Sequence, residues 1–181
     1  LILVFIVFVK LLILLLYSSQ FVAILSMTEW VMLGMFFRAF SWTISFAFIA
    51  RGESKTFFIN ELISSIYTLG FYMLGYKIYG FEGMGIAFVL SYICYCFQMF
   101  LLAKIKFQFY IEKNVLKTII IQILFCIGLF IVLNVVGYGF YRYIIGFIFI
   151  TASIFFTYRQ LSRMMDLKTI IQQFKNKLIK K

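Results

Sequence analysis

The chain has 181 residues, of which 65% are apolar, 22% aromatic and only 13% charged, and its formal net charge is +11. A soluble domain is ordinarily about 45–50% apolar and about 25% charged. A small domain leaves much of its surface exposed, so it cannot hide this much apolar area from water. The composition excludes a soluble enzyme, a disordered chain and a secreted disulfide scaffold, and it predicts an integral membrane protein.

The residue types that are missing narrow the chemistry further. The chain has no histidine, which removes the usual nucleophile triads, zinc sites and haem ligands. Its six acidic residues are scattered, and its three cysteines lie inside apolar runs, where they are interpreted as small packing residues. We therefore expect no enzymatic activity, no metal and no cofactor.

Six apolar runs follow one another along the chain. A hydrocarbon core of about 30 Å requires about 20 apolar residues in a helix, and these runs are too long and too uniformly apolar for porin-type strands. In order, the runs cover about residues 1–17, 28–50, 57–79, 84–104, 115–137 and 140–158. They predict an all-α fold with six transmembrane helices. Because the chain begins at Leu1 without an initiator Met, we expect it to be the C-terminal part of a longer protein.

Basic residues alternate from one connection to the next. The connections after the second and fourth runs, together with the C-terminal segment, carry thirteen Lys and Arg residues, whereas the opposite connections carry only Lys77 and Arg142. Cytoplasmic loops are enriched in Lys and Arg, so we expect both chain ends to be cytoplasmic.

The segment 159–181 reads as a basic amphipathic helix beyond the last run. It is either attracted to anionic lipid headgroups or a plain orienting tail. No folded soluble domain carries its charge, so nucleic-acid binding is not expected.

Arg38 is the most unusual residue in the runs. It lies ten residues into the 28–50 run, which at about 1.5 Å per residue places it near the middle of the membrane. A charge there costs from about 2.5 kcal/mol upward and normally faces a cavity or a partner. Ser41 and Ser45 lie three and seven residues later, on the same helical face. The planar guanidinium suits phosphate oxygens.

Two further runs carry polar residues at helical spacing, and together with Arg38 they predict a common hydrated cavity. The alternative is that small residues in these stripes only allow close helix packing. Glu61 belongs to that cavity, reaches the lipid headgroups or pairs with Lys55. Lys10 either lines the transport pathway or extends its ammonium to the membrane interface. Gln122 and Asn134 look isolated, so the last two runs look peripheral. The stripes are Glu61, Ser64, Ser65, Thr68, Tyr72 and Gly75, then Ser91, Tyr95 and Gln98.

Three segments resemble bacterial lipid-linked oligosaccharide flippases of the multidrug/oligosaccharidyl-lipid/polysaccharide exporter superfamily. Residues 15–21 resemble an L-L-Y-x-x-x-F helix exit, and residues 30–55 are similar to a helix with a mid-span basic residue, Arg38, and an A-(K/R)-(G/A)-x-x-(K/R) turn at its end. Residues 79–88 resemble a G-x-x-G-x-(G/A)-x-A hairpin. The resemblance covers about residues 10–105. Some members carry an acidic residue three positions before the basic one, where this chain has Met35.

The resemblance implies a two-lobed, alternating-access transporter of the bacterial inner membrane, of which this chain would form the last six helices. Its substrate would be an undecaprenyl-pyrophosphate-linked oligosaccharide for O-antigen, lipopolysaccharide or other polysaccharide synthesis, and its partners would be membrane lipids and the missing N-terminal lobe. Arg38 would contact the substrate anion, supported by Ser41, Ser45 and Glu61. A multidrug-type exporter of the same superfamily and a non-transporting membrane scaffold are the alternatives.

Overall fold

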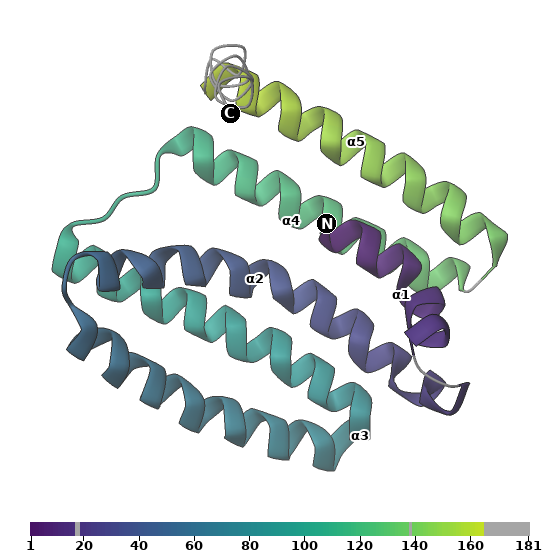
Figure 1. The fold of residues 1–181 in the computed structure, drawn as a ribbon, viewed down its shortest axis with the longest axis horizontal. Helices are drawn as coiled ribbons and strands as arrows, with labels where there is room; N and C mark the ends of the chain where they lie inside the picture. Colours follow the sequence, from purple (N-terminus) through teal and green to yellow (C-terminus); the bar gives the residue numbers. More distant parts are fainter. Residues whose placement is uncertain (17–18, 138, 165–181) are drawn as a thin grey trace, which may run out of the picture.

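The computed structural model describes residues 1–16, 19–137 and 139–164, and all regular structure in these ranges is helical. Each of the six predicted runs is helical over most of its length. The elements are α1 (Ile2–Leu16), the 3-10 helix η1 (Ser19–Ile24), α2 (Leu25–Ala50), α3 (Ser54–Phe107), α4 (Lys113–Val136) and α5 (Phe140–Met164) (Figure 1).

The 54-residue α3 folds back on itself. Its backbone leaves helical geometry at Tyr79 and at Gly80, where φ is +60°, a conformation that glycine adopts without steric cost. The two arms, residues 54–78 and 81–107, run antiparallel (Figure 1). A Cβ atom on Gly75 would overlap the carbonyl oxygen of Gly83, so the arms touch backbone to backbone near the turn. The predicted runs 57–79 and 84–104 are therefore the arms of one hairpin.

The described helices pack around three apolar clusters, the smallest of which joins Val9 and Ile13 of α1 to Leu25 of α2. α2 packs along α3, α4 pairs with α5, and α1 contacts α2, α4 and α5. Leu33 of α2 and Leu129 and Leu133 of α4 join residues of α1 in one cluster. Phe48 of α2 and Met99 of α3 centre another. α1 contacts α2 as well as both helices of the α4–α5 pair, so it helps to join that pair to α2 and α3.

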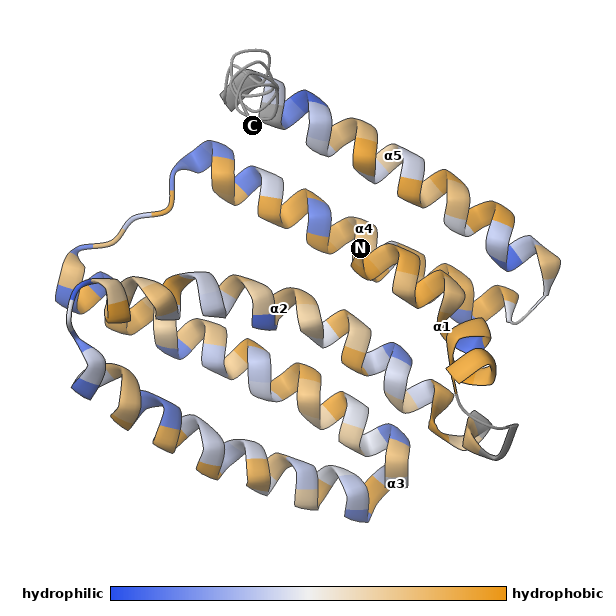
Figure 2. Ribbon diagram, in the orientation of Figure 1, coloured by the Kyte–Doolittle hydropathy of each residue, from blue (hydrophilic) through white to orange (hydrophobic). Residues whose placement is uncertain are grey.

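Within the part of the chain that the structure describes, four helices are long and apolar enough to cross a membrane: α2, α3, α4 and residues 140–160 of α5. Many of their exposed side chains are large and apolar, and Figure 2 shows hydrophobic residues along each of them, with hydrophilic residues interspersed. A stripe on the first arm of α3 consists of exposed Phe58, Leu62, Ile66, Leu69 and Met73. These are the features of a multi-pass membrane protein. α1 is equally apolar but has only 15 residues, and six crossings and a two-lobed assembly stay predictions.

The basic connections meet at one end of the bundle. Lys106 Nζ at the end of α3 lies 2.5 Å from Glu53 Oε2, which precedes the same helix, and Figure 1 shows the connections 51–53 and 108–112 at that end. This clustering is what the alternation of basic loops predicts. The predicted tail over 159–181 begins as the last turns of α5, and residues 165–181 lie outside the described residues.

Candidate functional site

The predicted polar stripes meet at one cavity of about 130 Å³ between α2 and the two arms of α3. The first arm contributes four polar residues, the second contributes a serine and two tyrosines, and α2 contributes a tryptophan. The cavity thus takes part of each predicted α3 stripe, while Tyr72, Gly75 and Gln98 of those stripes do not line it. The lining residues are Trp42, Glu61, Ser64, Ser65, Thr68, Ser91, Tyr92 and Tyr95.

The serine hydroxyls of the cavity donate their protons to helix backbone. Ser64 Oγ and Ser65 Oγ each donate to the carbonyl oxygen of Glu61 at 2.8 Å, and Ser91 Oγ donates to that of Ala87 at 2.7 Å. Such back-bonding is common for serine inside helices. Because each hydroxyl has one proton and two lone pairs, the oxygens remain available as acceptors. This part of the wall therefore favours ligands that donate hydrogen bonds.

Glu61 is held by a chain of hydroxyl groups. Tyr95 Oη donates to Glu61 Oε1, and Ser45 Oγ lies 2.7 Å from Tyr95 Oη. Since the single tyrosine proton points at the carboxylate, Ser45 is the donor in the second bond. The chain connects α2 with both arms of α3. The alternative in which Glu61 pairs with Lys55 is wrong, because among the described residues the carboxylate bonds Tyr95 and forms no ion pair.

Arg38 lies against two rings that line the cavity. Its guanidinium carbon is 4.7 Å from the ring centroid of Trp42 and 5.4 Å from that of Tyr92. Within the described ranges it forms no ion pair, and its buried Nε has no hydrogen-bond partner. Cation–π contacts stabilise a desolvated guanidinium by about 2 kcal/mol but leave its charge in place. The site thus presents a cation without an ion-pair partner among the described residues, beside a wall of acceptor oxygens that includes the Glu61 carboxylate.

The predicted stripe on α2 divides into two roles. Ser45 joins the Tyr95–Glu61 chain, whereas Ser41 is fully buried, donates to the carbonyl oxygen of Arg38 at 2.9 Å and does not line the cavity. A Cβ atom on Gly34 would overlap the ring of Phe88 on the second arm. For Ser41 and Gly34, close helix packing is therefore the better interpretation.

Lys10 lies apart from this site. It lines a separate cavity of about 380 Å³ with leucines of α1 and with Tyr143 of α5. Of the predicted site residues, Glu61 alone lines the first cavity, whereas Arg38 and Ser45 contact side chains that line it. Lys10 lines another cavity.

A buried ion pair that sequence reasoning missed joins four helices. Arg142 of α5 is 2% exposed, and its Nη2 lies 2.5 Å from Oε1 of Glu29 on α2, which is 6% exposed. The guanidinium also donates to carbonyl oxygens of α1, at 2.9 Å to Ile6 and 3.3 Å to Val7, and of α4, at 3.4 Å to Leu133. The placement of Arg142 in a connection is wrong, because Arg142 lies in the first turn of α5 and its donors point into the bundle.

One signal could have revealed this pair. Glu29 opens the 28–50 run and Arg142 opens the 140–158 run. In a bundle of alternating helices both runs begin at the same end, so opposite charges lie at the same depth. A charge inside a span normally has a partner, and the partner was available at that depth.

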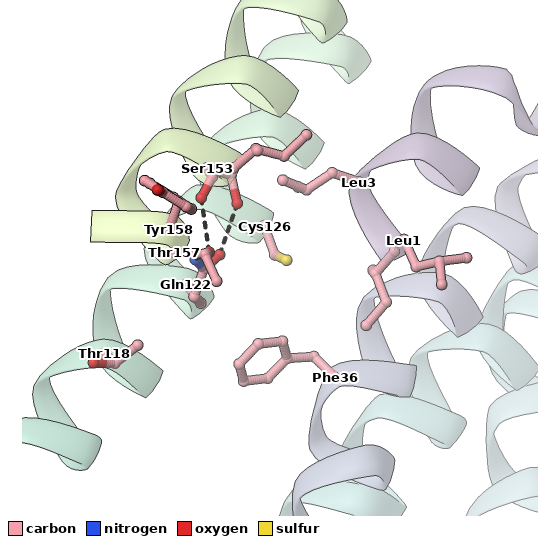
Figure 3. Close-up of a pocket in the computed structure, with 11 residues that line it drawn as sticks. Leu1, Leu3, Phe36, Thr118, Gln122, Cys126, Ser153, Thr157 and Tyr158 are labelled. Atoms are coloured by element: carbon pink, nitrogen blue, oxygen red, sulfur yellow. Dashed lines mark hydrogen bonds between the residues drawn. The ribbon is translucent and has the colours of Figure 1, made fainter. Parts of the chain in front are cut away.

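Gln122 is not isolated, contrary to the sequence interpretation. Figure 3 shows it at a cavity of about 570 Å³, where it bonds two residues of α5. Gln122 Nε2 donates to Thr157 Oγ1 at 2.6 Å, and Ser153 Oγ donates to Gln122 Oε1 at 2.9 Å. Such bonds hold membrane helices together. α4 and α5 are nevertheless the least buried of the four long helices, as their peripheral position predicts.

Among the residues that the structure describes, no group of three or more Cys, Asp or Glu side chains could hold a metal ion. Comparisons of the chain with protein-family profiles, with curated proteins and with solved structures found no significant match. The resemblance to oligosaccharide flippases therefore rests on the sequence motifs, and the chemistry of the site rests on its geometry.

Proposed function

We propose that this chain is part of a transporter that moves an undecaprenyl-pyrophosphate-linked oligosaccharide across the bacterial inner membrane, from the cytoplasmic to the outer leaflet. The observation that carries the proposal is the guanidinium of Arg38. It lies against the rings of Trp42 and Tyr92, beside a polar cavity in the apolar bundle, and it forms no ion pair within the described residues.

The two halves of such a substrate fit two features of the site. A guanidinium binds phosphate oxygens in pairs and keeps its charge at any physiological pH. Sugar hydroxyls donate hydrogen bonds, for which the oxygens of Ser64, Ser65 and Ser91 are acceptors. The carboxylate of Glu61 adds a stronger acceptor beside them.

The cavity is one wall of a larger pathway in this proposal. Its volume of about 130 Å³ has room for several water molecules, whereas ligand pockets ordinarily occupy about 300–1,000 Å³. Transporters commonly bind substrate between two repeats that rock against each other. A second lobe of the protein would supply the rest of the pathway. No covalent chemistry is required, so the protein would not be an enzyme.

A multidrug-type exporter is the second candidate, and Glu61 favours it. The carboxylate lies in a cavity with Trp42, Tyr92 and Tyr95, and aromatic rings around an acid suit a cationic, apolar drug. The two candidates differ in which charge the substrate needs, Arg38 or Glu61.

The test replaces each charge in the full-length protein in its host. Arg38→Ala should abolish surface polysaccharide while the protein remains inserted at normal amount, and Arg38→Lys should restore part of it. Lys55→Ala, an exposed cation at the end of the bundle, is the matched control and should leave polysaccharide unchanged. Normal polysaccharide with Arg38→Ala would contradict the proposal. Loss of cationic dye export with Glu61→Gln, at normal polysaccharide, would favour the exporter.

A further inference from the structure

A third cavity lies at the basic end of the bundle, away from the Arg38 site. It occupies about 270 Å³ between the last turns of α2, the end of α3, the connection 108–112 and the first turn of α4. Its lining is apolar apart from Thr43 and one charged residue, Arg51, and includes Phe40, Phe107 and Phe109. An apolar cavity with a single cation has the chemistry of an amphiphile site.

The connection between α3 and α4 builds the outer wall of this cavity. Gln108 ends α3 in the left-handed conformation, with φ of 53°, and the chain then runs without helix to Glu112. The Phe109 N–H donates to the carbonyl oxygen of Ala103 at 3.3 Å, which fixes the start of this segment against α3. Phe109 and Ile111 consequently line the cavity.

The neighbouring acidic residue, Glu53, does not form an ion pair with Arg51. Glu53 pairs instead with Lys106, at 2.5 Å, and within the described residues Arg51 forms no ion pair. Its guanidinium carbon lies 4.4 Å from the ring centroid of Phe107, so the cation packs on an aromatic ring of the cavity wall. Arg51 also directly follows the C-terminus of α2, at the end of the bundle where the basic connections meet.

We propose that this cavity binds one acyl chain of an anionic phospholipid, with the lipid phosphate at Arg51. The enclosed apolar lining suits a hydrocarbon chain, the guanidinium suits a phosphate, and both lie at the end of the bundle where the basic connections meet. Anionic lipids concentrate next to such basic segments. This inference does not depend on the transport proposal, because the Arg51 cavity and the Arg38 cavity share no lining residue.

The test places a fluorescent reporter in the cavity of the full chain. The Phe109→Trp variant is reconstituted in vesicles that contain brominated phosphatidylglycerol or brominated phosphatidylcholine. The fluorescence of Trp30 and Trp42 is measured in the unsubstituted chain and subtracted from that of the variant. Leu69→Trp, at a position of α3 that is 62% exposed and lies away from the basic connections, is the matched control. We expect the Phe109→Trp reporter to be quenched at about fivefold lower content of the anionic lipid, the preference that about one charge gives. The control should be quenched alike by both lipids.

Two further variants separate charge from folding. Arg51→Gln should remove the lipid preference, Arg51→Lys should keep most of it, and Ala47→Leu should weaken quenching by either lipid because it fills the cavity. Equal quenching of Phe109→Trp by both lipids, or an unchanged preference in Arg51→Gln, would overturn the proposal. It would also be overturned if polyprenyl phosphate relieved the quenching and excess unbrominated phosphatidylglycerol did not.

Discussion

Breaking the Arg142–Glu29 ion pair is expected to destabilise the helix bundle severely. In Arg142→Met the Glu29 carboxylate loses its guanidinium partner at a site 6% exposed, and three backbone carbonyls of α1 and α4 lose a donor. Removing one partner of a buried pair costs about 3–5 kcal/mol. We expect a loss of this size in the free energy of unfolding.

The double variant Glu29→Leu/Arg142→Met shows whether Arg142→Met loses stability because the Glu29 charge stays buried without its guanidinium partner or because packing is lost. Replacing both partners of a buried pair by apolar residues is often neutral or stabilising, so the double variant should be more stable than Arg142→Met alone. Unfolding in detergent can be followed through Trp30, which adjoins Glu29 and packs on Phe130 with ring centroids 4.7 Å apart.

The exposed ion pair of Lys106 with Glu53 supplies the control. Lys106→Met should change the free energy of unfolding far less than Arg142→Met, because exposed pairs contribute little. A free energy of unfolding for Arg142→Met within about 1 kcal/mol of the unsubstituted chain would contradict a stabilising buried pair. So would a double variant that loses as much as both single variants together.

Three further outcomes can be measured in the same way. Gly75→Ala should lower the free energy of unfolding by about 1–3 kcal/mol, because the added Cβ would overlap the Gly83 carbonyl. Gly70→Ala is the control: no atom lies within 4 Å of its added Cβ, so it should be neutral or stabilising by up to about 1 kcal/mol. The Lys106 ammonium lowers the pKa of the Glu53 carboxyl from 4.5. The stabilisation by this pair should therefore be fully present above pH 4.5 and lost as pH falls through the lowered pKa. Hydrogen exchange of the first turn of α3 should rise only below pH 4.5. Gln122→Leu, which breaks two bonds between α4 and α5, should cost about 0.5–2 kcal/mol, and an unchanged stability would show that these bonds do not hold the helices.

The sequence predicted the helices well and their partners poorly. Each apolar run is long enough for a membrane helix and is bounded by a polar turn, so the runs predict the helix ranges. The glycines of residues 79–88 marked the turn of the α3 hairpin. Helical spacing also identified the face on which Glu61, Ser64 and Ser91 lie. Which neighbour that face meets depends on packing between helices, and periodicity along one helix carries no such information.

The missed residues show this limit. Trp42 and Tyr92 lie against Arg38, but in a chain that is 22% aromatic no sequence pattern distinguishes a ring beside the cavity from a ring that faces lipid. Arg142 and Glu29 are 113 residues apart. The alternation of the runs places both at the same depth, but whether α2 and α5 are close enough to pair is known only once the helix order in space is known.

The most direct test of the central claim asks whether the lipid-linked oligosaccharide lies beside Arg38 during transport. The photoreactive residue p-benzoylphenylalanine replaces Trp42, on the cavity wall, or Phe46, which lies one turn later on α2 and is 61% exposed. In living cells the probe at position 42 should crosslink to lipid-linked oligosaccharide, the probe at position 46 should not, and Arg38→Ala should abolish the crosslink. Equal crosslinking from both positions, or a crosslink that persists in Arg38→Ala, would contradict the account.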